Sequence, residues 1–172
     1  MQRFNGKVAI VTGAGNGIGL GIATAFAAEG ATVVIADINP AAGEAAAAAL
    51  VAEGGRAISI PVDVSDEAQV EQLVARTVAE LGQIDILVNN AGVVAHKLLV
   101  DMELETWRRQ IDVQLTGPFL VSRHVARHMI ARGAPGRIVN ISSVSALMGR
   151  VKGGAHCSSK AGLTLLTKVL AM

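Results

Sequence analysis

The sequence contains no tyrosine, and aromatic residues make up only 2% of its 172 residues. Cys157 is the single cysteine, so no disulfide can form within the chain and nothing indicates secretion. The net charge of +1 gives no broad basic field of the kind that binds nucleic acid or anionic membranes. Charges or glycines interrupt every apolar run before it reaches membrane-spanning length, and the first seven residues lack the apolar segment of a signal peptide. We therefore expect a cytoplasmic protein without nucleic-acid or membrane partners.

Hydrophobic residues, by contrast, make up 51% of the sequence, which is enough for the core of one domain. Near-continuous apolar runs alternate with helix-length segments, and such runs suit strands that are buried on both faces of a parallel sheet. The runs lie at 7–12, 31–36, 56–62, 84–90 and 137–142. We predict a single α/β domain over residues 1–172, with a doubly wound, Rossmann-like parallel sheet of strand order 3-2-1-4-5 between two helical layers.

A glycine-rich turn, TGAGNGIG at 12–19, joins the first apolar run to a helix-like segment. Gly13, Gly17 and Gly19 allow a tight turn and let backbone N–H groups approach a phosphate, while the helix N-terminus adds partial positive charge. Eighteen residues past Gly19, the second apolar run ends in Asp37, where a carboxylate is placed to bind the hydroxyls of an adenosine ribose. This combination predicts a dinucleotide-binding site.

Polar and small residues follow the three later apolar runs. Asp63 and Val64 follow the third run and could hold adenine, NNAG at 89–92 follows the fourth, and two serines ending at Ser143 follow the fifth. In an open parallel sheet, ligands bind at the carboxyl ends of the strands, so these residues should face the same site. The segment His156–Lys160 then opens the last predicted helix, 156–172.

Together these segments resemble the short-chain dehydrogenase/reductase family along the whole chain. The resemblance rests on TGAGNGIG at 12–19, Asp37, Asp63-Val64, NNAG at 89–92, Ser143 and Lys160. It implies an oxidoreductase that transfers a hydride between NAD(H) and a small secondary alcohol or ketone. It also implies a homo-oligomer, either a dimer or a tetramer.

The resemblance assigns roles to individual residues. Ser143 would polarise the substrate carbonyl, Lys160 would hold the ribose, and an acid such as Asp37 favours NAD because it repels the 2′-phosphate of NADP. Cofactor binding is implied for Gly13, Asn16, Gly17, Ile18, Gly19, Asp37, Asp63, Val64, Asn90, Ala91, Gly92 and Lys160. No metal is expected: His124 and His128 share a predicted helix face but lie among arginines, which favours a solvated face over a metal pair.

Two catalytic positions depart from the family pattern. His156 stands four residues before Lys160, where the family has tyrosine, and Gln114 replaces an asparagine in the long helix predicted over 103–132. Lys160 and a positively charged nicotinamide should lower the pKa of His156, which would leave it mostly neutral near pH 7 and a weakened base. Pro118 lacks the N–H that would bond the Gln114 carbonyl, so we expect a kinked helix and a free carbonyl that could hold a water near Lys160.

The candidate catalytic set is therefore Ser143, His156, Lys160 and Gln114. Two interpretations stay open: an active NAD-dependent dehydrogenase, and a catalytically impaired or inactive NAD-binding variant or fragment of such an enzyme. The chain ends at Met172, whereas family members continue for two more strands and a substrate-covering segment. An unpaired fifth strand would invite aggregation. We therefore expect either a longer natural chain or an oligomer that covers this edge.

Overall fold

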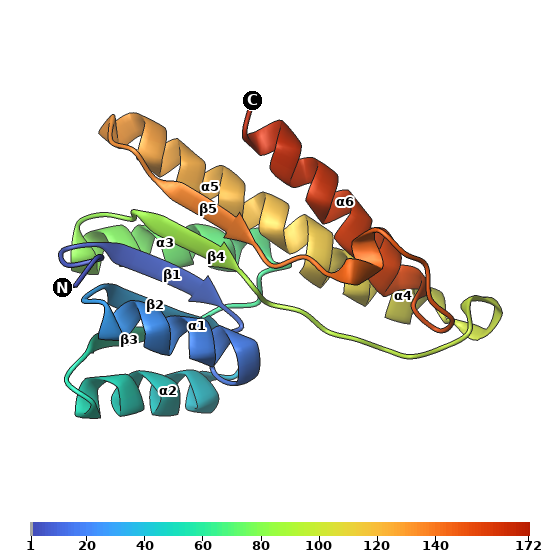
Figure 1. Cartoon of the computed structure of the whole chain (residues 1–172), viewed down its shortest axis with the longest axis horizontal. Helices are drawn as coiled ribbons and strands as arrows, with labels where there is room; N and C mark the ends of the chain where they lie inside the picture. Colours follow the sequence, from blue (N-terminus) through green and yellow to red (C-terminus); the bar gives the residue numbers. More distant parts are fainter. Residues whose placement is uncertain (1) are drawn as a thin grey trace.

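The computed structural model describes residues 2–172 and contains a five-stranded parallel sheet of order β3-β2-β1-β4-β5 (Figure 1). The strands are β1 (Val8–Thr12), β2 (Thr32–Asp37), β3 (Arg56–Pro61), β4 (Ile86–Asn89) and β5 (Arg137–Asn140). Central strand β1 pairs with β2 on one side, Val8 opposite Thr32, and with β4 on the other, Ala9 opposite Ile86. The predicted doubly wound sheet and its strand order are confirmed.

Helices cover both faces of the sheet and separate two apolar cores. Helices α1 (Gly17–Ala28) and α2 (Pro40–Ala52) pack small side chains against one face, whereas α3 (Glu67–Leu81) and α5 (Gly117–Arg132) pack larger ones against the other. The first core includes Ala23, Ala27, Ala46, Ala47 and Leu50, and the second includes Val70, Leu73, Leu120, Val121 and Val125. Alanine-rich helices can approach a sheet closely because no long side chain separates the two layers.

The long helix predicted over 103–132 is divided by one wide turn. It consists of α4 (Leu104–Ile111), a π-helical segment (Asp112–Thr116) and α5, in which the Gly117 N–H donates to the Asp112 carbonyl five residues earlier. Pro118 follows directly, and its missing N–H removes an α-helical bond at this place. The wide turn lies where the sequence predicts a kink, and it buries the side chains of Val113 and Gln114.

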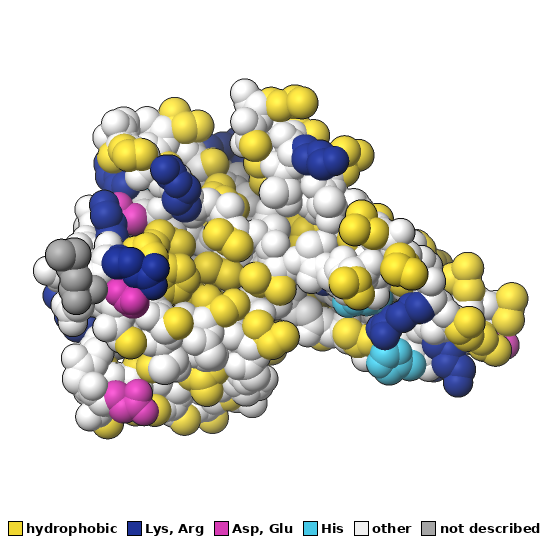
Figure 2. All heavy atoms as spheres, viewed as in Figure 1, with side chains coloured by type: hydrophobic (Ala, Val, Ile, Leu, Met, Phe, Trp, Pro, Cys, Tyr) yellow, Lys and Arg dark blue, Asp and Glu magenta, His cyan; other side chains and the backbone are white. Residues whose placement is uncertain are grey.

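The last helix, α6 (Gly154–Leu170), lies against α4 and the π-helical segment. It begins two residues before the predicted start, so His156 lies in its first turn. Short 3-10 turns, Leu99–Asp101 and Val144–Ala146, interrupt the loops that follow β4 and β5. Both loops run toward the same end of the molecule, and apolar side chains gather on the surface there (Figures 1 and 2). None of the helices within residues 2–172 combines the length and apolar character needed to cross a bilayer.

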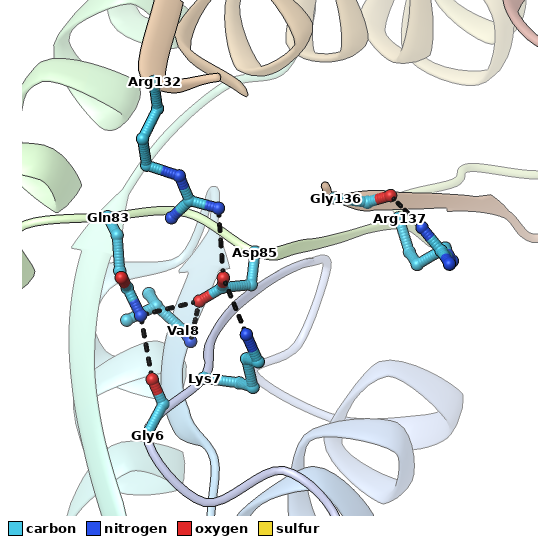
Figure 3. A network of polar contacts seen from close by, with 8 residues as sticks. All are labelled: Gly6, Lys7, Val8, Gln83, Asp85, Arg132, Gly136 and Arg137. Atoms are coloured by element: carbon cyan, nitrogen blue, oxygen red, sulfur yellow. Dashed lines mark hydrogen bonds and ion pairs between the residues drawn. The ribbon is translucent and has the colours of Figure 1, made fainter. Parts of the chain in front are cut away.

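A buried carboxylate joins three elements at the amino end of the sheet (Figure 3). Asp85, just before β4, accepts hydrogen bonds from the Val8 N–H at 2.9 Å, Gln83 Nε2 at 2.9 Å and Arg132 at 3.1 Å, with Lys7 at 3.4 Å. Burial raises the pKa of Asp85, but the Val8 and Arg132 hydrogen bonds and the nearby Lys7 charge outweigh it, so the net pKa lies below its ordinary value. This network fixes β1, β4 and the end of α5 relative to one another.

Candidate active site

A cleft of about 490 Å³ opens at the carboxyl ends of the strands. All of the residues that the sequence places in the site line this cleft, except Gly17. The predicted lining residues are Gly13, Asn16, Ile18, Gly19, Asp37, Asp63, Val64, Asn90, Ala91, Gly92, Gln114, Ser143, His156 and Lys160. Residues from every strand end and from the π-helical segment and α6 therefore share one cavity, as expected for a doubly wound sheet.

The glycine-rich turn has no room for a side chain at Gly13 or Gly19. Gly13 has a φ of +62°, and a Cβ there would lie 2.8 Å from the Ala91 Cα, while a Cβ on Gly19 would overlap the Gly13 carbonyl. Gly17 also has a positive φ, +56°, so its part is to let the chain enter α1 although it does not line the cleft. No side chain caps the N-terminus of α1, so its first N–H groups are available to a phosphate.

The NNAG segment holds this turn in place. The Asn90 side chain donates to the carbonyls of Thr12 at 2.9 Å and Gly13 at 3.1 Å. In the other direction, the backbone N–H groups of Asn90 and Ala91 donate to the Thr12 hydroxyl at 3.0 and 3.1 Å. The end of β4 is thereby bonded to the end of β1. Asn90 thus orients the glycine-rich turn with its side chain in addition to lining the cleft.

Asp37 is buried at the end of β2, yet part of its hydrogen-bonding capacity is free. One carboxylate oxygen accepts from the Gly15 N–H at 2.8 Å, and the other accepts from the Asn39 N–H at 2.9 Å. A carboxylate offers about four acceptor positions, so these two bonds fix its orientation and leave about two positions unused. The geometry fits a carboxylate that accepts two adjacent ribose hydroxyls.

Asp63 lies beyond the end of β3 rather than on the strand, and its carboxylate is already paired. It accepts from the Ser65 N–H and hydroxyl at 2.9 and 2.6 Å and forms a 3.0 Å ion pair with Arg109 of α4. Burial raises its pKa, but the Ser65 and Arg109 hydrogen bonds outweigh it, so the net pKa lies below the ordinary value. Arg109 also lines the cleft. Arg109 is not among the predicted site residues, because nothing in the local pattern marks an arginine that pairs 46 positions away.

The two departures from the family pattern meet inside the cleft. His156 Nδ1 lies 2.9 Å from Oε1 of Gln114, and Gln114 Nε2 donates to the Val93 carbonyl. Gln114 thus faces the site with its side chain, whereas the sequence indicates only its backbone carbonyl as a group that could act there. Burial lowers the pKa of His156, and the charges of Lys160, Arg150 and His96 lower it further. The expected neutral imidazole is consistent with this direction.

Lys160 and Ser143 complete the polar part of the site. Lys160 is 6% exposed, its Nζ donates to the Ile141 carbonyl at 2.6 Å, and burial lowers its pKa. An ammonium carries three N–H donors, so two stay available for a ligand. The Ser143 hydroxyl accepts from the Ser145 N–H at 3.1 Å, which leaves its own O–H free to donate into the cleft. The site therefore combines a hydroxyl donor, an imidazole and a fixed cation.

The histidines outside the cleft have structural surroundings. His124 and His128 on α5 are half-buried rather than solvated, which corrects the expected exposed face. His124 Nε2 lies 3.6 Å from Glu67 of α3, so the helix face packs against a neighbour that the local sequence did not indicate. Within residues 2–172, no group of three or more His, Cys, Asp or Glu side chains is arranged to hold a metal ion.

The chain is similar to a known protein family, to individual relatives and to a solved structure. A family model described as short chain dehydrogenase matches residues 7–172. An uncharacterized oxidoreductase of Thermotoga maritima is 44% identical over 169 residues, covering 98% of this chain and 66% of that protein. Galactitol 2-dehydrogenase of Agrobacterium fabrum is 41% identical over 171 residues, covering 99% and 66%. A crystal structure of a short-chain type dehydrogenase/reductase from Mycobacterium marinum is similar with a TM-score of 0.94 and 37% identity, covering 98% of this chain and 69% of that one. The chain thus spans about two thirds of the length of these relatives.

Proposed function

The chain belongs to the short-chain dehydrogenase family, and on that premise we propose that it transfers a hydride between NAD(H) and a secondary alcohol or ketone. One observation carries the proposal: Ser143, His156 and Lys160 line the same cleft as the glycine-rich turn and Asp37. The oxidoreductase description of the T. maritima relative and the dehydrogenase name of the A. fabrum relative support catalysis over the alternative, a nucleotide-binding variant without turnover.

The residues of the cleft fit a nicotinamide dinucleotide. Gly13 and Gly19 have no Cβ in the closely packed turn beside the uncapped start of α1, where a pyrophosphate would be bound. When bound, the cofactor supplies or accepts the hydride, and the protein provides binding, orientation and proton transfer. Lys160 would then hold the nicotinamide ribose with its two free N–H donors.

Asp37 supports NAD(H) rather than NADP(H) as the cofactor. Its buried carboxylate is fixed by two backbone N–H groups, and it would repel a 2′-phosphate at the position where it accepts ribose hydroxyls. No arginine follows in Ile38-Asn39-Pro40 to neutralise such a phosphate. Titration of both reduced cofactors against Trp107 fluorescence tests the preference, and equal or tighter binding of NADPH contradicts it.

Ser143 and His156 have different roles at the reacting oxygen of the substrate. The free O–H of Ser143 can donate to the substrate oxygen, while the imidazole of His156 exchanges the proton of that oxygen with solvent. Val93 and Val94 give the neighbouring wall an apolar character, which suits the carbon skeleton of an alcohol or ketone.

Turnover with a broad panel of secondary alcohols, polyols such as galactitol, and ketones tests the activity. We expect NADH formation or consumption by the parent chain and a changed rate in His156→Tyr. If neither protein turns over any member of the panel while both bind NADH, the non-catalytic alternative holds.

The expected homo-oligomer and cytoplasmic location stay predictions. Apolar side chains on the outer helices support association between copies: Phe119 and Ile130 on α5 and Leu165 and Val169 on α6 are all more than 40% exposed. Light scattering on the purified protein measures the oligomeric state directly, and a monomer contradicts the prediction.

A further inference from the structure

The two catalytic positions that differ from the family pattern, Gln114 and His156, are hydrogen-bonded to each other. Gln114 projects from the π-helical segment and is 1% exposed, and its Oε1 meets Nδ1 of His156 at 2.9 Å. Either residue alone would be an isolated substitution. Because the two side chains are in contact, the orientation of each one constrains the orientation of the other.

The surroundings of Gln114 determine which end of its amide faces the imidazole. Its Nε2 donates to the Val93 carbonyl, which can only accept, so Oε1 must point toward His156. The Ser159 hydroxyl, which donates to the His156 carbonyl at 2.9 Å, also lies 3.4 Å from Oε1. Because a hydroxyl carries one hydrogen, Ser159 can donate fully to only one of these two oxygens, and the orientation of the Gln114 amide rests on the Val93 contact.

This orientation determines the tautomer of the ring. Because Oε1 only accepts, Nδ1 of His156 must carry the hydrogen, and in the neutral ring the lone pair then lies on Nε2. We propose that Gln114 is a positioning residue that holds neutral His156 as the Nδ1–H tautomer, so that Nε2 accepts the proton of an alcohol substrate. The proposal rests on the proposed dehydrogenase function and gives it a direction, the oxidation of alcohols.

The proton and electron balance of this step is simple. The O–H proton of the alcohol passes to Nε2, the hydride leaves the carbinol carbon with its electron pair for the oxidised nicotinamide, and the carbon–oxygen double bond forms. The resulting imidazolium then returns its proton to solvent. In the opposite direction, a ketone would need His156 to be charged before it could donate, which the surroundings of the ring oppose.

Basic side chains from three segments act on the ring. Lys160 lies on α6, Arg150 lies in the loop before α6, and His96 lies in the loop after β4. Partial burial of the ring, together with these groups, keeps the pKa of His156 below its ordinary 6.5. The rate of alcohol oxidation should therefore rise with pH through this lowered pKa and level off near neutrality.

The test uses NMR of the full chain labelled with ¹⁵N and ¹³C in histidine, with His156→Phe identifying the signal of His156. We expect the Nδ1–H tautomer in the parent chain and a substantial Nε2–H population in Gln114→Leu. The rate of alcohol oxidation in Gln114→Leu should fall about 10- to 100-fold, because a misoriented base loses its alignment with the substrate. Gln110→Leu is the matched control: this glutamine lies one turn earlier, is 2% exposed, and its amide has no hydrogen-bond partner within the described residues.

A second variant separates positioning from folding. Gln114→Glu keeps an acceptor beside Nδ1, so the Nδ1–H tautomer should persist even if the stability of the protein changes. The Nε2–H tautomer in the parent chain, or an unchanged tautomer in a folded Gln114→Leu, overturns the proposal. The NMR result does not depend on turnover, so a chain with the expected tautomer but no activity contradicts the proposed function and leaves the positioning role of Gln114 intact.

Discussion

The two ends of the sheet each bury an aspartate, and the difference between these residues separates structure from function. At the amino end, the carboxylate of Asp85 receives four donors, two on each oxygen, which fills its acceptor capacity (Figure 3). At the carboxyl end, Asp37 receives only two, one on each oxygen. A carboxylate whose acceptor positions are all filled by protein donors can only stabilise the fold. A carboxylate with about half of these positions free is fixed in place and can still bind a ligand.

The same contrast extends to other polar groups of the carboxyl end. The described contacts of Lys160 use one of its three N–H donors, and Nε2 of His156 carries no protein partner among residues 2–172. Each of these two side chains is held by one hydrogen bond, and its remaining donors or acceptors are available to a ligand in the cleft. Substitutions at the two ends should therefore separate activity from stability.

The largest expected effect is on turnover, at the carboxyl end. His156→Phe should lower kcat for alcohol oxidation by about 10²- to 10⁴-fold, because the group that exchanges the proton is removed. Its free energy of unfolding should fall by only about 1 kcal/mol, since the ring makes one side-chain hydrogen bond and the Ser159 hydroxyl lies within reach of the Gln114 Oε1 that loses its partner. Steady-state kinetics and urea unfolding measure the two quantities. His128→Leu, which removes a histidine outside the cleft, should keep the parent rate.

The next largest effect is on stability, at the amino end. Asp85→Ala should lower the free energy of unfolding by about 3 kcal/mol, because it leaves the partly buried Arg132 and the Val8 N–H without their acceptor. The affinity for NADH measured on the folded fraction should not change. A large loss of affinity would show that the two ends are coupled.

The same aspartate should control stability in acid. Its pKa is lower in the folded than in the unfolded state, so the unfolded state binds more protons and stability rises with pH in this range. The contribution is fully present above about pH 4, the ordinary range of an aspartate, and is lost as the pH falls through the folded-state pKa. Urea unfolding between pH 2.5 and 6 should show a weaker pH dependence in Asp85→Asn, and an unchanged slope contradicts the assignment.

A smaller effect is expected on cofactor choice. Asp37→Ser should shift the ratio of NADH to NADPH affinity toward NADPH by about 10- to 100-fold, because the repulsion of the 2′-phosphate is removed together with one ribose acceptor. Trp107 fluorescence titrations of both cofactors give the ratio. An unchanged ratio of NADH to NADPH affinity would show that the adenosine ribose does not bind at Asp37.

The smallest effect is expected at the rim of the Asp85 network. Lys7 is half-exposed and 3.4 Å from the carboxylate, so Lys7→Ala should cost less than about 1 kcal/mol of unfolding free energy. Chemical denaturation in low and high salt distinguishes this weak, screened pair from the buried Arg132 contact. If Lys7→Ala lowered the free energy of unfolding nearly as much as Asp85→Ala, all four donors to Asp85 would be needed for its stabilising effect.

The sheet and the glycine-rich turn could be predicted because their determinants are local. Apolar runs mark the strands, and TGAGNGIG followed by Asp37 places glycines and an acid at positions that the turn and the strand end determine. The Asn39 and Asp66 side chains cap α2 and α3, as their position before these helices indicates. In each case the physical cause lies within a few residues of the feature.

The remaining parts of the site depend on side-chain contacts between distant segments. Arg109 pairs with Asp63, and Gln114 bonds to His156, across 46 and 42 positions. Proline chemistry predicted a disturbed helix near Gln114, but only the geometry of the wide turn shows that the side chain faces the imidazole. The four hydrogen bonds to Asp85 could likewise not be predicted from the sequence, because their donors come from residues 7, 8, 83 and 132.

The central position of β1 has a consequence for the order in which the protein folds during synthesis. The β2 partner of β1 follows within about 20 residues, but Ala9 meets Ile86 only after a further long stretch of chain has emerged. Until then, a ribosome-bound intermediate of β1, β2 and β3 would expose one full backbone edge of its most apolar strand, open to a wrong partner. Pairing of β4 with β1 closes that edge and moves the open edge to β4, where it stays until β5 pairs there.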